Sequence, residues 1–209
     1  MDHITWRSHI QQRTDFATRV THLTRSSEKK CAYENLIKIL EEKMIHGSTT
    51  DSGFIVGNNS AVCFQDVPLL CLAENLEYEK TVNSKTRYEG YGLRFNKIAL
   101  YKKGARPVLY GKTQELKKLL PETEYWRIVN HDLSNQDYVI DWTHEREWRF
   151  KGSLPFEYKD IEILVYSDND YQSLVKYFQH SNPDLLHQIH GIILGDKLIS
   201  TDFSNSIVI

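Results

Sequence analysis

The apolar residues of this chain fall into short β-prone runs that are interleaved irregularly with helical segments. Runs such as "GYGLRF" at 90–95 and "IEILVY" at 161–166 have the length of strands rather than of helices. Between such runs lies a clear helical pattern at 32–46, where apolar residues recur at every third or fourth position. Because no repeating strand–helix–strand rhythm links these segments, a doubly wound parallel sheet is not expected. We therefore predict an α+β fold.

The remaining elements are expected from local composition and from turn residues. We expect a helix at 4–19, the helix at 32–46 to stop at Gly47, and a helix from Pro68 to about residue 77. Further helical segments are expected at 113–120 and at 170–190, the latter broken by Pro183. Additional strands are expected at 19–23, 54–57, 61–64, 107–111, 124–130, 144–150 and 190–196, with 54–57 and 61–64 forming either a hairpin or two separate short strands.

Chain length and composition place limits on the class of protein. The 209 residues are 40% hydrophobic and contain no Pro- or Gly-rich linker, so we expect a single domain over 1–209. The formal net charge of −2 gives no global attraction for nucleic acid. Three cysteines without a CxxC pair indicate a reducing compartment, and no run reaches the roughly 20 apolar residues of a membrane span. We expect a cytoplasmic protein without a membrane contact.

The segment "EREWRF" at 145–150 is the first candidate for chemistry. On a strand, Glu145, Glu147 and Arg149 would share one face, and Trp148 and Phe150 would lie buried on the core side. Two carboxylates facing a cleft can orient a sugar hydroxyl and stabilise an oxocarbenium ion. The alternative is a surface charge ladder in which Arg149 pairs with Glu147.

The segment "VTHLTR" at 20–25 is the second candidate. His22 and the threonines beside it could hold a nucleotide, or His22 could be a structural histidine with a satisfied hydrogen bond. Asp66 is explained as a helix N-cap before Pro68. Cys63 is explained as a small core residue, and the C-terminal histidines lack the further ligands that a metal site needs.

Several motifs occur together in an order that resembles the DarT-like ADP-ribosyltransferases. The motifs are "VTHLTR", "NLIKILEEKMIHG" and "AVCFQDVPLL", followed late in the chain by "EREWRF". The middle of the chain also resembles the AbiGi-type abortive-infection proteins, through "CFQDVPL", "YEGYGLRFNKIAL", "GARPVLY" and the "EREWR" ending. The combined resemblance covers residues 20–150.

The resemblance implies an ADP-ribosyltransferase-like fold, with a split, mostly antiparallel β core, surrounding helices and NAD bound as substrate in its cleft. It implies that His22 and Thr24 hold a ribose of NAD and that Glu147 is the catalytic glutamate. Glu145 corresponds to the first glutamate of the Glu-x-Glu pair in arginine-modifying relatives, where it acts on the acceptor. Residues 160–209 would complete the fold with strands and helices.

In one respect the chain departs from the DarT-like pattern, in which an arginine after the first helix lies near the NAD phosphates. Residues 47–64 contain no arginine or lysine. The phosphate contacts would therefore come from Arg25 or Arg87. If the two candidate segments form the walls of one nucleotide cleft, His22 and Glu147 should line the same pocket.

The function that the resemblance implies is NAD-dependent mono-ADP-ribosylation by a toxin-like or phage-defence effector. The acceptor would be a nucleic acid or a protein, and an antitoxin or another defence protein would be a partner. Two alternatives stay open. The chain could be an NAD glycohydrolase, with water as the acceptor on the same fold, or a non-catalytic module that senses a ligand or a partner.

Overall fold

The centre of the protein is a mostly antiparallel sheet. The computed structural model describes residues 2, 4–6, 8, 12–81 and 87–198. Seven strands of this part of the chain form the sheet, and among its neighbouring strands only β10 and β11 are parallel. In spatial order they are β11 (Ile192–Leu194), β10 (Ile161–Val165), β4 (Gly92–Asn96), β1 (Arg19–Leu23), β3 (Ala61–Gln65), β8 (Glu147–Lys151) and β5 (Arg106–Pro107). The predicted α+β class is confirmed.

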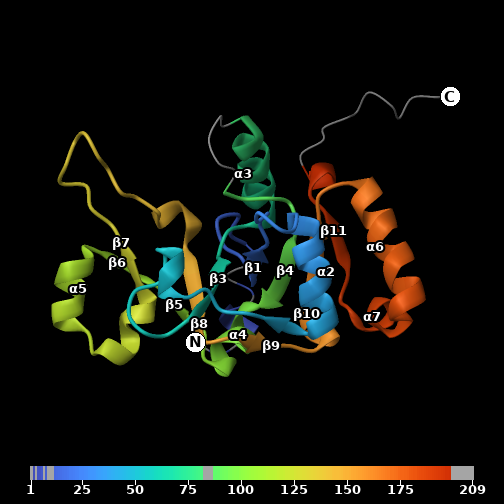
Figure 1. Ribbon diagram of the computed structural model, residues 1–209, viewed down its shortest axis with the longest axis horizontal. Helices are drawn as coiled ribbons and strands as arrows, with labels where there is room; N and C mark the ends of the chain where they lie inside the picture. Colours follow the sequence, from blue (N-terminus) through green and yellow to red (C-terminus); the bar gives the residue numbers. More distant parts are fainter. Residues whose placement is uncertain (1, 3, 7, 9–11, 82–86, 199–209) are drawn as a thin grey trace.

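Helices and two small sheets surround this centre. Figure 1 shows α3 above the sheet, α6 and α7 beyond β11, and α5 with β6 and β7 on the opposite side. The small sheets pair β2 (Met44–Ile45) with β9 (Leu154–Pro155), and β6 (Leu109–Gly111) with β7 (Ile128–Asn130). The α-helices are α2 (Ala32–Glu42), α3 (Leu69–Thr81), α4 (Lys97–Lys103), α5 (Thr113–Leu119), α6 (Asp168–Ser181) and α7 (Pro183–Gln188). The 3-10 helices are η1 (Thr50–Ser52), η2 (Glu122–Arg127), η3 (Thr143–Glu145), η4 (Tyr158–Asp160) and η5 (Asp196–Leu198).

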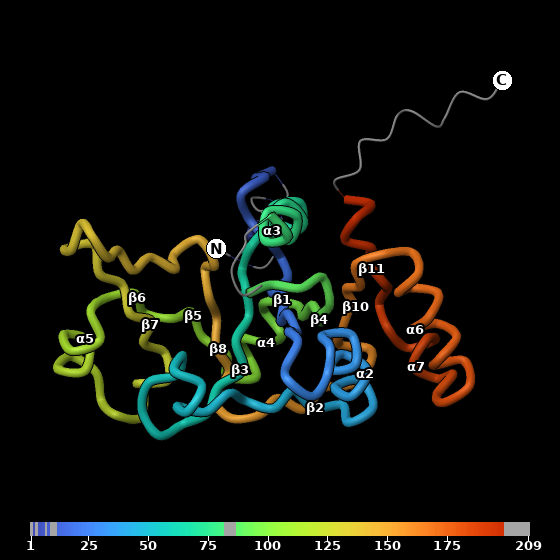
Figure 2. Tube along the Cα trace, turned by 45° about the horizontal axis from the view of Figure 1, so that its top comes forward, coloured from blue at the N-terminus to red at the C-terminus, as the bar shows by residue number. Residues whose placement is uncertain are grey.

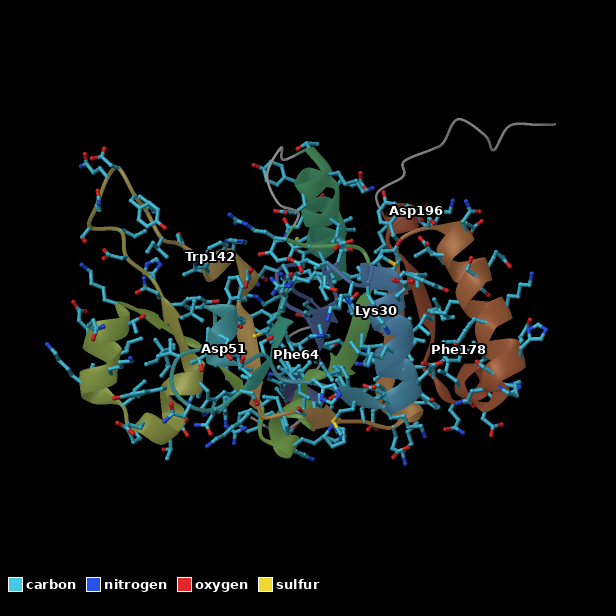
Figure 3. All side chains as sticks on the ribbon, in the orientation of Figure 1. Lys30, Asp51, Phe64, Trp142, Phe178 and Asp196 are labelled. Carbon is cyan, nitrogen blue, oxygen red and sulfur yellow. The ribbon has the colours of Figure 1, made fainter. Side chains whose placement is uncertain are left out.

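One face of the sheet carries the main hydrophobic core. Because side chains alternate along a strand, Val20, Phe64 and Phe95 point to this face from three adjacent strands. Leu36 of α2 and Phe178 of α6 belong to the same buried cluster. Figure 3 labels Phe64 near the middle of the molecule and Phe178 on α6. Burial of these apolar side chains stabilises the fold and holds the strands in register.

The other face of the sheet is covered only in part by apolar residues. Leu72 and Leu76 of α3 pack against Leu164 of β10. At the far side, Ile55 and Trp126 pack against Ala61 of β3. Polar and charged side chains lie between these two clusters, and we call this side the polar face of the sheet.

Two predicted boundaries are wrong for identifiable reasons. The helix predicted at 32–46 ends at Glu42, because Lys43 adopts a left-handed conformation (φ 49°) and caps it, so Gly47 is not the stop. The strand predicted at 61–64 is confirmed as β3, but the strand predicted at 54–57, and with it the hairpin, is wrong. Residues 54–57 are not a strand, and β3 pairs instead with β1 and β8.

Other segments differ from prediction in kind. The strand predicted at 107–111 is split, because β5 joins the main sheet and β6 joins a small one. Residues 122–127 are a 3-10 helix before β7, and the helix α4 was not predicted. In the helix predicted at 4–19, residues 12–18 are not helical, and residues 7 and 9–11 lie outside the described residues.

Candidate active site

A row of polar residues crosses the polar face of the sheet. Strand pairing places Glu162 beside Arg94, and Arg94 beside Thr21. The row continues from Thr21 to Gln65, and from Gln65 to Glu147. These five residues lie on five consecutive strands, so their side chains share one face. The tube in Figure 2 lets the reader follow the same five strands from β10 to β8.

Glu147 forms a bidentate ion pair with Arg149 on this face. Arg149 Nε donates to Glu147 Oε1 at 2.7 Å, and an Nη atom donates to Oε2 at 3.2 Å. Glu147 is only 7% exposed and Arg149 only 3%. Their two-residue spacing on β8 puts both side chains on the same face, as the sequence predicted. The pairing of Arg149 with Glu147 that the alternative predicted is therefore present. Its predicted setting is wrong, because the pair is buried and β8 lies between β3 and β5 instead of at the edge of the sheet.

The guanidinium of Arg149 also binds three backbone carbonyl groups. One terminal nitrogen donates to Trp126 O at 2.8 Å and Ile128 O at 3.1 Å, and the other donates to Phe54 O at 3.1 Å. Glu147 raises the pKa of Arg149 against the opposing effect of burial. The ion pair therefore joins β8 to the loop that contains Phe54, which we call the 54 loop, and to the segment 126–128. Either charge would be costly to bury alone, so the two residues must be buried together and in contact.

Glu145 is arranged differently from Glu147. It ends the 3-10 helix η3, and Arg146 follows in a left-handed conformation (φ 46°), so the strand begins only at Glu147. The carboxylate of Glu145 accepts a hydrogen bond from the hydroxyl of Tyr88. Burial raises the pKa of Glu145, and the nearby charge of Glu147 acts in the same direction. The two glutamates are thus electrostatic neighbours, but Glu145 is half-buried and has no bidentate partner among the described residues.

Cys63 and Tyr110 complete the surroundings of this pair. Cys63 lies opposite Arg149 on β3, and burial raises the pKa of its thiol well above the ordinary value. The Glu147 carboxylate acts in the same direction. The backbone N–H of Glu147 donates to the Tyr110 hydroxyl oxygen at 2.8 Å, and burial raises the pKa of Tyr110 to about 12. Both groups are therefore protonated at neutral pH, and the thiol is not a thiolate nucleophile.

His22 does not join this site. Thr21 belongs to the polar row, so the next residue, His22, points to the opposite face of the sheet. Its ring packs edge-on against Phe64, with ring centroids 5.9 Å apart, and its Nδ1 lies 2.9 Å from Cys63 O. Burial lowers the pKa of His22. The prediction that His22 and Glu147 line one pocket is wrong. His22 directly follows Thr21 on β1, so its side chain lies on the core side, whereas Thr21 and Glu147 lie on the polar face.

Thr24 and Arg25 have surroundings that differ from each other. The hydroxyl of Thr24 is within hydrogen-bond distance of Ala32 O (2.9 Å) and Tyr91 O (3.1 Å). This buried contact anchors the loop between β1 and α2. Arg25 is exposed, and its guanidinium lies 5.4 Å from the centre of the Phe54 ring.

Arg87 is the one predicted phosphate-binding residue that lies near a glutamate. Burial raises the pKa of Glu145, and the positive charge of Arg87 opposes this rise, which places Arg87 in the electrostatic surroundings of that carboxylate. Its guanidinium stacks 4.7 Å from the Trp142 ring, and Figure 3 labels Trp142 at the foot of the long loop after β7. The structure therefore brings together Glu145, Glu147 and Arg87, whereas His22 lies on the opposite face of the sheet and the Thr24 hydroxyl contacts backbone carbonyls. Arg25 contacts Phe54, whose carbonyl oxygen accepts a hydrogen bond from Arg149.

Trp148 and Phe150 point to the core side, as predicted. Both pack against the main core cluster, and Trp148 Nε1 donates to Asp66 Oδ2 at 3.1 Å. Both side chains are partly buried against the core, which agrees with the predicted orientation, although neither is fully enclosed. The most buried side chains of β8 are the ion pair, because the 54 loop and η2 cover the polar face there. Asp66 bonds Trp148 and Lys97, whereas the sequence suggested an N-cap role.

Several residues of the polar face escaped the sequence reasoning. Tyr88 opens the segment "YEGYGLRFNKIAL" and Tyr110 closes "GARPVLY", but neither segment was assigned a role at the site. A signal was present for Arg94, because an arginine inside the apolar run "GLRF" requires a buried partner. Glu162, in the run "IEILV", is the matching signal on the neighbouring strand.

Comparison with family models matched none of them to this chain, and searches of curated proteins and of solved structures likewise returned no match. Among the described residues, no helix has both the length and the apolar character needed to cross a bilayer. In the same residues, no group of three or more His, Cys, Asp or Glu side chains is arranged to hold a metal ion.

Proposed function

We propose that this protein is an NAD-dependent mono-ADP-ribosyltransferase that acts as a toxin-like or phage-defence effector. The observation that carries the proposal is the pair of neighbouring carboxylates on the polar face, one fixed by Arg149 and one half-buried. Two carboxylates placed in this way suit a reaction in which positive charge develops on a sugar ring. The mostly antiparallel sheet is compatible with a split transferase-like β core.

The surroundings of the two glutamates give them different roles in this proposal. Arg149 occupies both carboxylate oxygens of Glu147, so Glu147 is fixed in an ion pair beside Glu145 and is not the carboxylate that contacts the ribose. Glu145 has one oxygen bonded by Tyr88 and is the carboxylate that contacts the ribose. The bond between ribose C1′ and the nicotinamide nitrogen breaks, and its electron pair leaves with nicotinamide. The acceptor atom then bonds to C1′ and gives its proton to Glu145, whose raised pKa suits it as a base.

The same geometry also favours a second candidate, a non-catalytic module. Every oxygen of Glu147 and every nitrogen of the Arg149 guanidinium has a partner within the protein. Such a closed network is what a purely structural ion pair requires. In this case the polar face would hold the fold together, and the chain would sense a ligand or a partner without turnover.

NAD titration and product analysis separate the candidates. The wild-type protein is titrated with NAD in a calorimeter, and the products are then identified by mass spectrometry in the presence of cell extract. A transferase binds NAD and attaches ADP-ribose to a macromolecule, whereas a glycohydrolase yields free ADP-ribose. Absence of heat and of any melting-temperature shift at millimolar NAD would reject the enzyme and leave the non-catalytic module. The same measurements are made on the variant Glu145→Gln, and Glu28→Gln, at an exposed site, is its matched control.

A further inference from the structure

The opposite end of the polar row holds an excess of positive charge. Arg19 Nε lies 2.8 Å from Glu162 Oε1, and a terminal nitrogen of Arg94 lies 2.6 Å from Glu162 Oε2. Two guanidinium groups therefore share a single carboxylate. Arg94 is 9% exposed, and burial lowers its pKa, as does the charge of Arg19. The cluster thus keeps a net charge of about +1 in a poorly solvated position, which is unfavourable without an anion.

Within the part of the chain that the structure describes, two donors of this cluster have no hydrogen-bond partner. They are the Nη1 atom of Arg19 and the Nε atom of Arg94, and both are buried. A buried donor without a partner loses its hydration and gains nothing in return. The fork of N–H groups on an arginine matches the oxygen atoms of a phosphate group. The unpaired donors and the excess charge thus call for the same kind of ligand.

We propose that Arg19 and Arg94 form a binding site for a phosphate-type oxyanion. Glu162 fixes the two guanidinium groups, and the oxyanion takes the donor positions that this single carboxylate leaves open. The site is inferred from its own charges and unpaired donors, and it does not depend on the transferase reaction. Its ligand is the diphosphate of a nucleotide or free inorganic phosphate, which share the same chemistry.

The position of the site suits a nucleotide that also reaches the glutamates. Arg94 and Glu147 lie in the same row, separated by two intervening strands. At about 4.8 Å between neighbouring strands, their backbones are about 14 Å apart. The two side chains extend over the same face of the sheet and shorten this separation. The cluster would supply the phosphate contacts for which the segment 47–64 has no cation.

Isothermal titration with inorganic phosphate, inorganic pyrophosphate and ADP-ribose at low salt tests this site. We expect wild type to bind pyrophosphate and ADP-ribose, and Arg94→Gln to weaken both by about 10-fold or more through loss of charge-assisted hydrogen bonds. Arg13→Gln removes the same charge from an exposed arginine and should leave binding unchanged. Tighter binding of ADP-ribose than of inorganic phosphate would identify the nucleotide as the source of the oxyanion, and the reverse order would identify free phosphate.

Glu162→Gln provides a test that does not depend on the folding of Arg94→Gln. Without the carboxylate, two buried cations remain, so the melting temperature should fall and pyrophosphate should raise it more than in wild type. Failure of wild type to bind any of the three probes at millimolar concentration would overturn the proposal. The same conclusion would follow if binding were equal in wild type and Arg94→Gln. Nicotinamide release is measured separately, so a failure of the transferase proposal is distinguishable from a failure of this site.

Discussion

Replacement of Arg149 by methionine is expected to destabilise the protein strongly. The change keeps a long apolar stem and removes the charge that neutralises Glu147, whose side chain is 8% exposed. Removal of one partner from a buried ion pair costs about 3–5 kcal/mol. Three backbone carbonyls also lose a donor, although relaxation and water entry offset part of that loss. At about 2–4 °C per kcal/mol for a chain of this size, the melting temperature should fall by about 6–20 °C.

Chemical denaturation followed by tryptophan fluorescence measures this loss, and a double variant tests its cause. In Arg149→Met with Glu147→Gln, the unpaired negative charge is absent, so the loss should be smaller than the sum of the two single losses by about 1–3 kcal/mol. A loss below about 1 kcal/mol for Arg149→Met alone would show that the pair is solvated in solution. Additive losses in the double variant would refute the argument that the two charges stabilise each other.

Three further variants test the assignment of faces and charges. Glu145→Gln should be at least as stable as wild type at pH 7, because burial raises the pKa of Glu145 in the folded state and wild-type stability therefore falls as the pH rises from the ordinary to the raised pKa. Denaturation at several pH values should show that the difference in stability between the two proteins vanishes below the ordinary glutamate pKa. Phe64→Ala should cost about 3–5 kcal/mol, and Trp148→Ala on the same face should cost less because Trp148 is only half-buried. Denaturation midpoints showing a loss for Trp148→Ala as large as that for Phe64→Ala would contradict this difference in burial. His22→Asn should lower the melting temperature but change nicotinamide release per folded molecule by less than about 10-fold, and a loss as large as that of Glu145→Gln would place His22 in the site after all.

The strands with a strong β-prone pattern could be predicted from sequence, whereas their neighbours in space could not. The segment "RVTHL" is β1 from its first residue to its last, because alternation and β-branched residues agree there. The pairing of β3 with β1 and β8 was not predicted, since the register of distant strands leaves no local signal. The end of α2 was missed because Lys43 takes a conformation that usually favours glycine.

The candidate site was predicted in part for similar reasons. The shared face of Glu147 and Arg149 follows from their spacing on one strand and needed no tertiary information. The opposite orientation of His22 follows from the register of β1 against β3, which is fixed only in the folded sheet. Tyr88 reaches Glu145 from a segment 57 residues away in the chain. It opens the segment "YEGYGLRFNKIAL", but nothing in that segment indicates which residue its hydroxyl contacts.

The rate of nicotinamide release from NAD tests the central claim most directly, namely that the glutamates of the polar face act on a ribose. Wild type, Glu145→Gln and the exposed control Glu28→Gln are compared at equal concentrations of folded protein. We expect Glu145→Gln to release nicotinamide about 100-fold more slowly than wild type, the scale of losing one preorganised electrostatic group, while Glu28→Gln matches wild type. Equal rates in wild type and Glu145→Gln, or no release above the buffer rate in wild type, would contradict the claim.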